Sequence, residues 1–241
     1  MSRHPPIAGG GSAGTEGTDF VGLSPTAFKY LYRGTSFTGL SASEVGWFYE
    51  DWVLPSFAGF QGAPWQTAST GSGTFALNSA GEKGGVIELK TGGVGSYRVS
   101  SLTPIVSNIS TDKWYVATRF KTSAVPDSRS YVGLRNLATT KTVAVGLFEG
   151  IEATNFCIQY DGDQTGSALS LATAQDASYH VFEMYGKGDG KVYGRIDGGA
   201  EVNATMSAAP TDSCFLTAQI NEGTSGAKSM FWDWVIAVFP R

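Results

Sequence analysis

The chain has 241 residues, of which 32 are glycine and only 16% are charged, a composition that favours short β-strands and tight turns. This length suits one large all-β domain with an extension, or two small domains. The formal net charge is −4 and no basic run occurs, which argues against a nucleic acid partner, because phosphate binding needs clustered Lys and Arg. No apolar run approaches ~18 residues, so no membrane partner is expected either.

Residues 1–44 differ in composition from the rest and are predicted to form an extended N-terminal arm. Residues 9–18 are mostly Gly, Ser and Thr, like a flexible linker, and no apolar secretory segment precedes them. Aromatic residues follow without a clear periodicity, so the segment cannot build a core of its own. We therefore expect the arm to dock on another surface. Its aromatic residues are Phe20, Phe28, Tyr30, Tyr32 and Phe37.

Residues 45–241 are predicted to form one antiparallel β-sandwich of about eleven strands and no helix. Alternating or continuous apolar runs recur between Gly-, Pro- and Asp-rich turns, which is typical of such a sandwich. The clearest alternation, over 113–122, places Trp114 on one face and Tyr115 on the other. Outside the hairpin described next, strands are predicted at 47–54, 75–77, 86–89, 97–106, 113–122, 131–137, 143–148, 156–160, 214–220 and 230–239.

Residues 179–199 predict a β-hairpin whose register can be worked out. A three-residue loop, 188–190, pairs Phe182 with Ile196 and keeps the apolar side chains on one face, whereas a two-residue turn would put the faces in conflict. Gly190 then suits the left-handed position that ends such loops. The same register sets Glu183 opposite Arg195, where we expect an exposed ion pair.

This hairpin resembles the one found in laminin-G-like and concanavalin A-like jelly rolls. The matching residues are Tyr179-His180 at its start and Ile196-Asp197-Gly198 at its end. Members of that superfamily bind sugars, cleave glycans, or serve as structural modules in virions and on cell surfaces. In these jelly rolls the first and last strands are neighbours. The similarity of residues 48–53 to 231–235 implies the same arrangement here.

No catalytic residues and no cofactor are predicted, and the chain is not expected to be an enzyme. The Gly-x-Ser-x-Gly match at 10–14 lacks the strand and helix that a nucleophile elbow requires. The paired acidic residues of glucanases with this fold, and the residue sets of its alginate lyases, do not occur. Of the two histidines, His180 lies on a predicted strand and is interpreted as structural.

Three binding features remain. Asp161 and Asp163 resemble the first ligands of a calcium loop, but the twelfth position is Ala172 where a bidentate Glu is needed, so the metal prediction is none. Trp65, in a predicted loop beside a proline, is the candidate for an exposed aromatic that stacks on a ligand. Cys157 and Cys214 fit no metal spacing and are interpreted as buried free thiols, with a disulfide as the alternative.

The sequence favours a non-enzymatic structural protein of a tailed-phage virion, because the jelly roll resembles modules found in such proteins. We expect a capsid decoration protein or a head- or tail-fibre component that is made in the host cytoplasm and attached through its N-terminal arm. Its expected partners are other virion subunits, as a homo-oligomer or bound to the capsid. The alternative is a carbohydrate-binding module or lectin that mediates surface adhesion, and a glycan-active enzyme ranks third.

Overall fold

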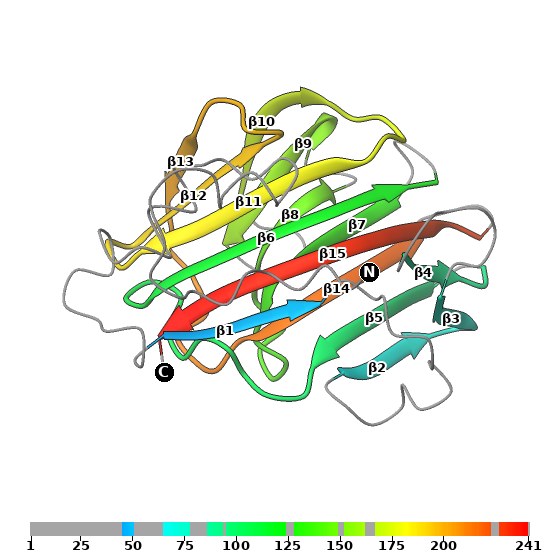
Figure 1. Cartoon of the computed structure of the whole chain (residues 1–241), viewed down its shortest axis with the longest axis horizontal. Coiled ribbons are helices and arrows are strands. Elements are labelled where there is room, and N and C mark those ends of the chain that lie inside the picture. Colours follow the sequence, from blue (N-terminus) through cyan, green and yellow to red (C-terminus); the bar gives the residue numbers. More distant parts are fainter. Residues whose placement is uncertain are drawn as a thin grey trace, which may run out of the picture.

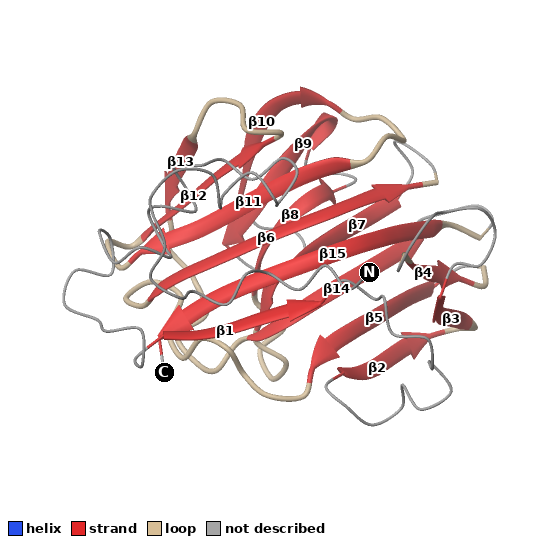
Figure 2. Cartoon of the chain, viewed as in Figure 1, coloured by secondary structure: helices blue, strands red, loops and turns tan. Residues whose placement is uncertain are grey.

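The computed structural model of the chain describes residues 45–50, 65–77, 86–93, 95–123, 128–148, 152–161, 167–222 and 227–240. These residues form two stacked antiparallel β-sheets, and every regular element among them is a strand (Figures 1 and 2). The predicted all-β antiparallel sandwich is thereby confirmed. In the described part of the chain, no helix is long and apolar enough to cross a bilayer. Residues 1–44, with the five aromatic residues of the predicted arm, lie outside the described residues.

One sheet, here sheet A, contains the N-terminal and the C-terminal strand of the described chain. Its strands are β1 (Val45–Glu50), β3 (Gly73–Leu77), β4 (Ile87–Thr91), β6 (Lys113–Thr122), β11 (His180–Lys187), β12 (Lys191–Ile196), β13 (Val202–Thr205) and β15 (Ser229–Pro240). Their order is β13-β12-β11-β6-β15-β4-β3, and β1 also pairs with β15 (Figure 1). The predicted pairing of the first and last strands is confirmed, with Val45 opposite Pro240 and Glu50 opposite Val235.

The other sheet, sheet B, is built from the remaining strands. They are β2 (Trp65–Thr70), β5 (Gly95–Ser101), β7 (Ser128–Arg135), β8 (Thr142–Phe148), β9 (Glu152–Asp161), β10 (Ser167–Ala174) and β14 (Phe215–Glu222). Their order is β10-β9-β8-β7-β14-β5-β2, so β14 lies between β7 and β5 although it follows both in sequence. This late strand fixes the register of its two neighbours and hence which of their side chains meet.

The main core fills the space between the sheets. Sheet A contributes Trp114, Phe120, Phe182 and Trp232, and sheet B contributes a layer of aliphatic residues on β7, β8, β9 and β14. The indole Nε1 of Trp232 donates to Thr118 Oγ1 at 2.8 Å, which satisfies a polar group at the centre of the core. Alternation along each strand therefore assigns one face to the core and the other to the outside of the sandwich.

The hairpin of β11 and β12 has the predicted register, with Phe182 opposite Ile196 and Glu183 opposite Arg195. Gly190 has a φ of 75°, as the three-residue loop required. The expectation that Glu183 is exposed is wrong. Its side chain is fully buried, because tyrosines of the neighbouring strands pack on the same outer face of sheet A.

Three strands were not predicted, and the strand predicted over 97–106 is shorter in the structure. β2, β10 and β13 consist largely of small or polar residues that give no clear apolar alternation. β5 ends at Ser101 rather than continuing to Val106. Val106 instead forms an isolated bridge with Cys214.

Candidate functional site

The structure contradicts the role predicted for Trp65. This residue begins β2, is only 2% exposed and packs edge-on against Trp232 with ring centroids 5.5 Å apart. It is part of the main core, so it cannot stack on a ligand. The sequence-based expectation of an exposed loop failed because the strand that buries Trp65 carries no apolar residue except Trp65 and Ala68.

The described part of the chain contains only one of the two acidic residues of the candidate calcium loop. Asp161 is the last residue of β9, and Asp163 lies outside the described residues. Within the described ranges, no group of three or more His, Cys, Asp or Glu side chains could hold a metal ion. Cys157 and Cys214 are buried thiols that are not joined in a disulfide, as expected, and burial raises the pKa of the Cys214 thiol to about 12.

The outer face of sheet B carries a row of polar residues that the sequence analysis missed. Arg98 on β5, Gln219 on β14 and Tyr131 on β7 lie directly opposite one another across the three strands. The residues next to them in sequence, Val99, Ala218 and Val132, belong to the core. Strand alternation therefore directs Arg98, Gln219 and Tyr131 away from the core. We call the residues on this face of β2, β5, β7 and β14 the sheet B polar face.

A second row lies two residues further along the same strands. Asn221 on β14 is opposite Ser96 on β5 and Arg129 on β7, and Ser96 is in turn opposite Thr70 on the edge strand β2. The hydroxyls of Ser96 and Thr70 are 3.0 Å apart. Asn221, Ser96 and Arg129 are half-buried and Thr70 is exposed, so this row is partly open to solvent.

Hydrogen bonds hold the amide of Gln219 in one orientation. Its Oε1 accepts from the Tyr131 hydroxyl at 2.7 Å and from Arg135 Nη1 at 3.1 Å, and its Nε2 donates to Asn221 Oδ1. Arg135 also donates to the Tyr131 hydroxyl at 2.9 Å. These side chains are buried except for Asn221, and burial raises the pKa of Tyr131. The network thus holds planar polar groups in a fixed arrangement on the strands next to the half-buried Arg98.

Two arginines of this face are not neutralised by a carboxylate. Neither Arg98 nor Arg135 forms an ion pair within the described residues, although Arg135 is only 3% exposed. The Arg135 Nε is buried and has no hydrogen-bond partner there. Burial and then the positive charge of Arg135 lower the pKa of Arg98. A buried, uncompensated cation costs several kcal/mol, so the local field favours an added anion.

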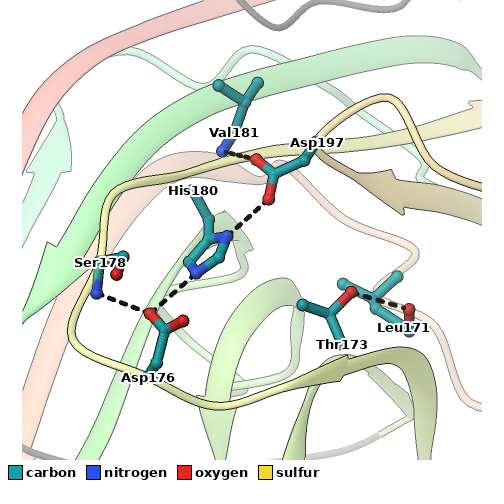
Figure 3. A network of polar contacts seen from close by, with 7 residues as sticks. All are labelled: Leu171, Thr173, Asp176, Ser178, His180, Val181 and Asp197. Carbon is teal, nitrogen blue, oxygen red and sulfur yellow. Dashed lines mark hydrogen bonds and ion pairs between the residues drawn. The ribbon is translucent and has the colours of Figure 1, made fainter.

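His180 belongs to a different cluster, which closes the start of the hairpin (Figure 3). Its Nδ1 is 2.6 Å from Asp197 Oδ2 and its Nε2 is 3.0 Å from Asp176 Oδ1. Asp197 Oδ1 also accepts from the Val181 amide, and Asp176 Oδ1 accepts from the Ser178 amide. Burial lowers the His180 pKa, but the hydrogen bonds to the two carboxylates outweigh it and the pKa is raised.

This histidine cluster is suited to structure rather than catalysis. Only the doubly protonated imidazole can donate to both carboxylates, since a neutral ring has a single N–H. Both ring nitrogens are occupied, and the Phe156 ring packs against the imidazole at 4.8 Å. The cluster therefore joins the turn before β11 to the end of β12.

The outer face of sheet A carries a network that is satisfied internally. The Tyr115 hydroxyl donates to Glu183 Oε2 at 3.0 Å, and Tyr185 hydrogen-bonds to Glu201. Arg195, predicted to pair with Glu183 on the surface, lies 3.2 Å from Glu201 through its Nη2. Lys187 approaches the other Glu201 oxygen at 3.7 Å. These acidic groups are thus engaged in holding β11, β12 and the segment before β13 together.

Comparisons with known proteins identify the fold. No family model matches the chain, and no curated protein matches it. A protein of unknown function from Shewanella oneidensis MR-1 is similar over 97% of both chains, with a TM-score of 0.58 and 16% identity. A β-glucanase from Bacillus licheniformis has a TM-score of 0.54 and 15% identity, with 81% of this chain and 98% of that chain covered.

A lectin gives a comparable match. Lectin I from Ulex europaeus, in complex with the methyl glycoside of α-L-fucose, has a TM-score of 0.55 and 11% identity, with 81% of this chain and 98% of that chain covered. Identities this low show the fold and nothing finer. The chain therefore has the concanavalin A-like sandwich fold that lectins and glucanases share.

Proposed function

We propose that the protein binds a carbohydrate chain on the sheet B polar face and does not cleave it. The observation that carries this proposal is the group of partly open polar residues Arg98, Ser96 and Asn221, which lie beside the buried and hydrogen-bonded Gln219 and Tyr131. Guanidinium, amide and hydroxyl groups are donors and acceptors that can exchange hydrogen bonds with sugar hydroxyls. The sharing of this fold by a lectin and a glucanase supports the proposal as an analogy between folds.

The packing of the face also suits recognition. Gln219 is held by two donors to its oxygen, and its nitrogen donates to Asn221, so the polar groups are ordered before a ligand arrives. Pre-ordered groups lose less side-chain entropy on binding, which favours affinity. The edge strand β2 adds exposed polar positions, Gln66 and Thr70, beside the half-buried residues of β5. A glycan lying across β2, β5 and β14 would meet polar groups on each strand.

The proposal that the ligand is not cleaved rests on the residues that form the two rows of the sheet B polar face, none of which is acidic. Glycan hydrolysis uses two carboxyl groups that flank the bond to be broken. Glu183 and Glu201 are on the outer face of sheet A, away from the sheet B polar face, and both are engaged by tyrosine or basic side chains. The polar face itself presents arginine, amide and hydroxyl groups at the positions described.

A glycan array, followed by calorimetry on the best ligand, tests the proposal. Asn221→Ala should weaken binding about two- to tenfold, the equivalent of one hydrogen bond of roughly 0.5–1.5 kcal/mol. Asn203→Ala is the matched control, because Asn203 is an exposed residue of β13 in the other sheet. The oligosaccharide recovered after the titration should be intact by chromatography. The absence of binding to any glycan would refute the proposed function, and shortened oligosaccharides would refute the binding-only role.

A virion role remains a second proposal, supported by the composition of residues 1–44. A Gly-rich start followed by Phe20, Phe28 and three further aromatic residues suits a segment that orders on a partner. Removing residues 1–44 should leave a folded sandwich that no longer joins virion subunits. Unfolding of the truncated protein would show instead that the aromatic segment belongs to the core. Normal assembly would place the attachment elsewhere.

A further inference from the structure

We infer that the carbohydrate bound on the sheet B polar face is acidic, an oligosaccharide whose uronate carboxylates are held by Arg98 and Arg129. This inference rests on the proposed function, because it names the ligand class of the same face. It depends on the charge of the face, the access to Arg98 and the spacing of the two arginines.

The charge of the face is positive and lacks an internal counterion at its centre. Arg98 and Arg135 have no carboxylate partner among the described residues, and the buried Nε of Arg135 has no hydrogen-bond partner there. Elsewhere the fold pairs its arginines, as Arg119 with Asp233 and Arg195 with Glu201. Within the described residues, Arg98 and Arg135 therefore differ from these two paired arginines.

Arg98 can reach a ligand because its neighbour on the sheet edge is small. Across the β2–β5 pair, Arg98 is opposite Ala68, and Ala68 is exposed. β2 is the last strand of sheet B, so no further strand stands beyond it in the sheet. On the other side, Arg98 is opposite Gln219, which is buried with only 4% of its surface exposed. The half-buried Arg98 thus lies between the exposed Ala68 on the edge strand β2 and the ordered amide of Gln219 on β14.

The spacing of Arg98 and Arg129 suits an oligosaccharide that carries more than one acidic group along its length. Arg98 and Arg129 lie two strands apart and two residues apart along the strands, which separates their Cα positions by about 12 Å. Asn221 is opposite Arg129, and Ser96 is opposite Asn221, so hydroxyl-binding groups lie between the two charges. A planar carboxylate can accept two parallel hydrogen bonds from a guanidinium, which a neutral sugar cannot do.

Other anionic polymers fit the chain less well. The protein has a net charge of −4, whereas nucleic acid binding draws on an extended field of Lys and Arg along the phosphate backbone. The sheet B polar face instead offers isolated arginines among Gln, Asn, Ser and Thr residues. This mixture suits a ligand in which carboxylates alternate with hydroxyls.

Calorimetric titration with an oligogalacturonate and with its methyl ester tests the inference, because esterification removes the carboxylate charge and leaves the sugar backbone and its hydroxyls unchanged. The acid should bind at least about tenfold more tightly than the ester in low salt, and the difference should shrink as NaCl is added. Arg98→Gln should remove at least about tenfold of the affinity for the acid, and Arg98→Lys should restore it only in part. Lys191→Gln, which removes a charge from β12 of the other sheet, should have no effect.

The outcomes separate the inference from the function on which it rests. Equal binding of acid and ester, or of neutral glycans alone, would overturn the acidic ligand while leaving carbohydrate binding in place. Tight binding of the acid that Arg98→Gln does not change would also overturn it, because another surface would then hold the charge. Failure of the wild-type protein to bind any carbohydrate would overturn the function and the inference together. Circular dichroism of each variant excludes unfolding as the cause of lost binding.

Discussion

Substitution of Gly190 by Val should destabilise the protein by at least about 1 kcal/mol through backbone strain alone. Gly190 has a φ of 75°, and a Cβ added there would meet nothing within 4 Å. Crowding around the added Cβ therefore contributes nothing, and the cost considered is that of a left-handed conformation, about 1–2 kcal/mol for a residue with a Cβ. A β-branched residue is the least suited to this region.

The loop cannot relax easily, because both backbone polar groups of Gly190 are engaged. Its N–H donates to the Ser110 carbonyl at 3.1 Å, and its carbonyl accepts from the Met206 amide at 2.9 Å. A change of φ would disturb contacts with the segment before β6 and the segment after β13. The strain should therefore remain in the folded state and appear in full in the free energy of unfolding.

Urea denaturation of wild type, Gly190→Val and Gly190→Asn measures this cost. Asn adopts the left-handed region far more readily than Val, so the Asn variant should retain most of the stability that the Val variant loses. An m-value common to the three proteins would show that the native and unfolded states are comparable. Equal midpoints for the Val and Asn variants would refute the argument, because strain at positive φ would then not govern the loop.

Two further perturbations test other parts of the structure. Trp65→Ala should destabilise the sandwich by about 3–5 kcal/mol in urea denaturation, because it leaves a cavity beside Trp232; a change below about 1 kcal/mol would contradict the burial of Trp65. The raised pKa of His180 predicts stability that is fully present below its unfolded pKa of about 6.5 and is lost as pH rises through the higher folded pKa. His180→Gln should flatten this part of the profile of unfolding free energy against pH, and an unchanged profile would show that the contacts with Asp176 and Asp197 are not the cause.

Local patterns in the sequence predicted the features that depend on one or two neighbouring strands. The alternation around Phe182 and Ile196 and the glycine at 190 determined the hairpin register correctly. β2 could not be predicted in the same way, because after Trp65 its exposed residues form no apolar pattern. Glu183 was assigned to the surface because alternation identifies a face but does not show what packs on it.

The sheet B polar face could not be predicted because its residues meet only through long-range pairing. Arg98, Gln219 and Tyr131 come from three segments whose order in the sheet differs from their order in the chain. The alternation of Arg129, Tyr131 and Arg135 with aliphatic residues on β7 was a usable signal. It indicated one polar face on one strand, but the partners on β5 and β14 depend on the register that the folded sheet imposes.

The position of β15 also constrains how the protein can fold during its synthesis. β15 pairs with β6 on one side and with β4 and β1 on the other, so the strand that follows all the other described strands of sheet A in sequence lies in the middle of that sheet. After β6 leaves the ribosome, its partner follows more than a hundred residues later, roughly 5–25 s at ordinary elongation rates. During this interval β6 presents an unpaired edge, which other nascent chains can join. The time during which ribosome-bound chains can be captured by chaperones or aggregate therefore depends on when Ser229–Pro240 is translated and pairs with β6.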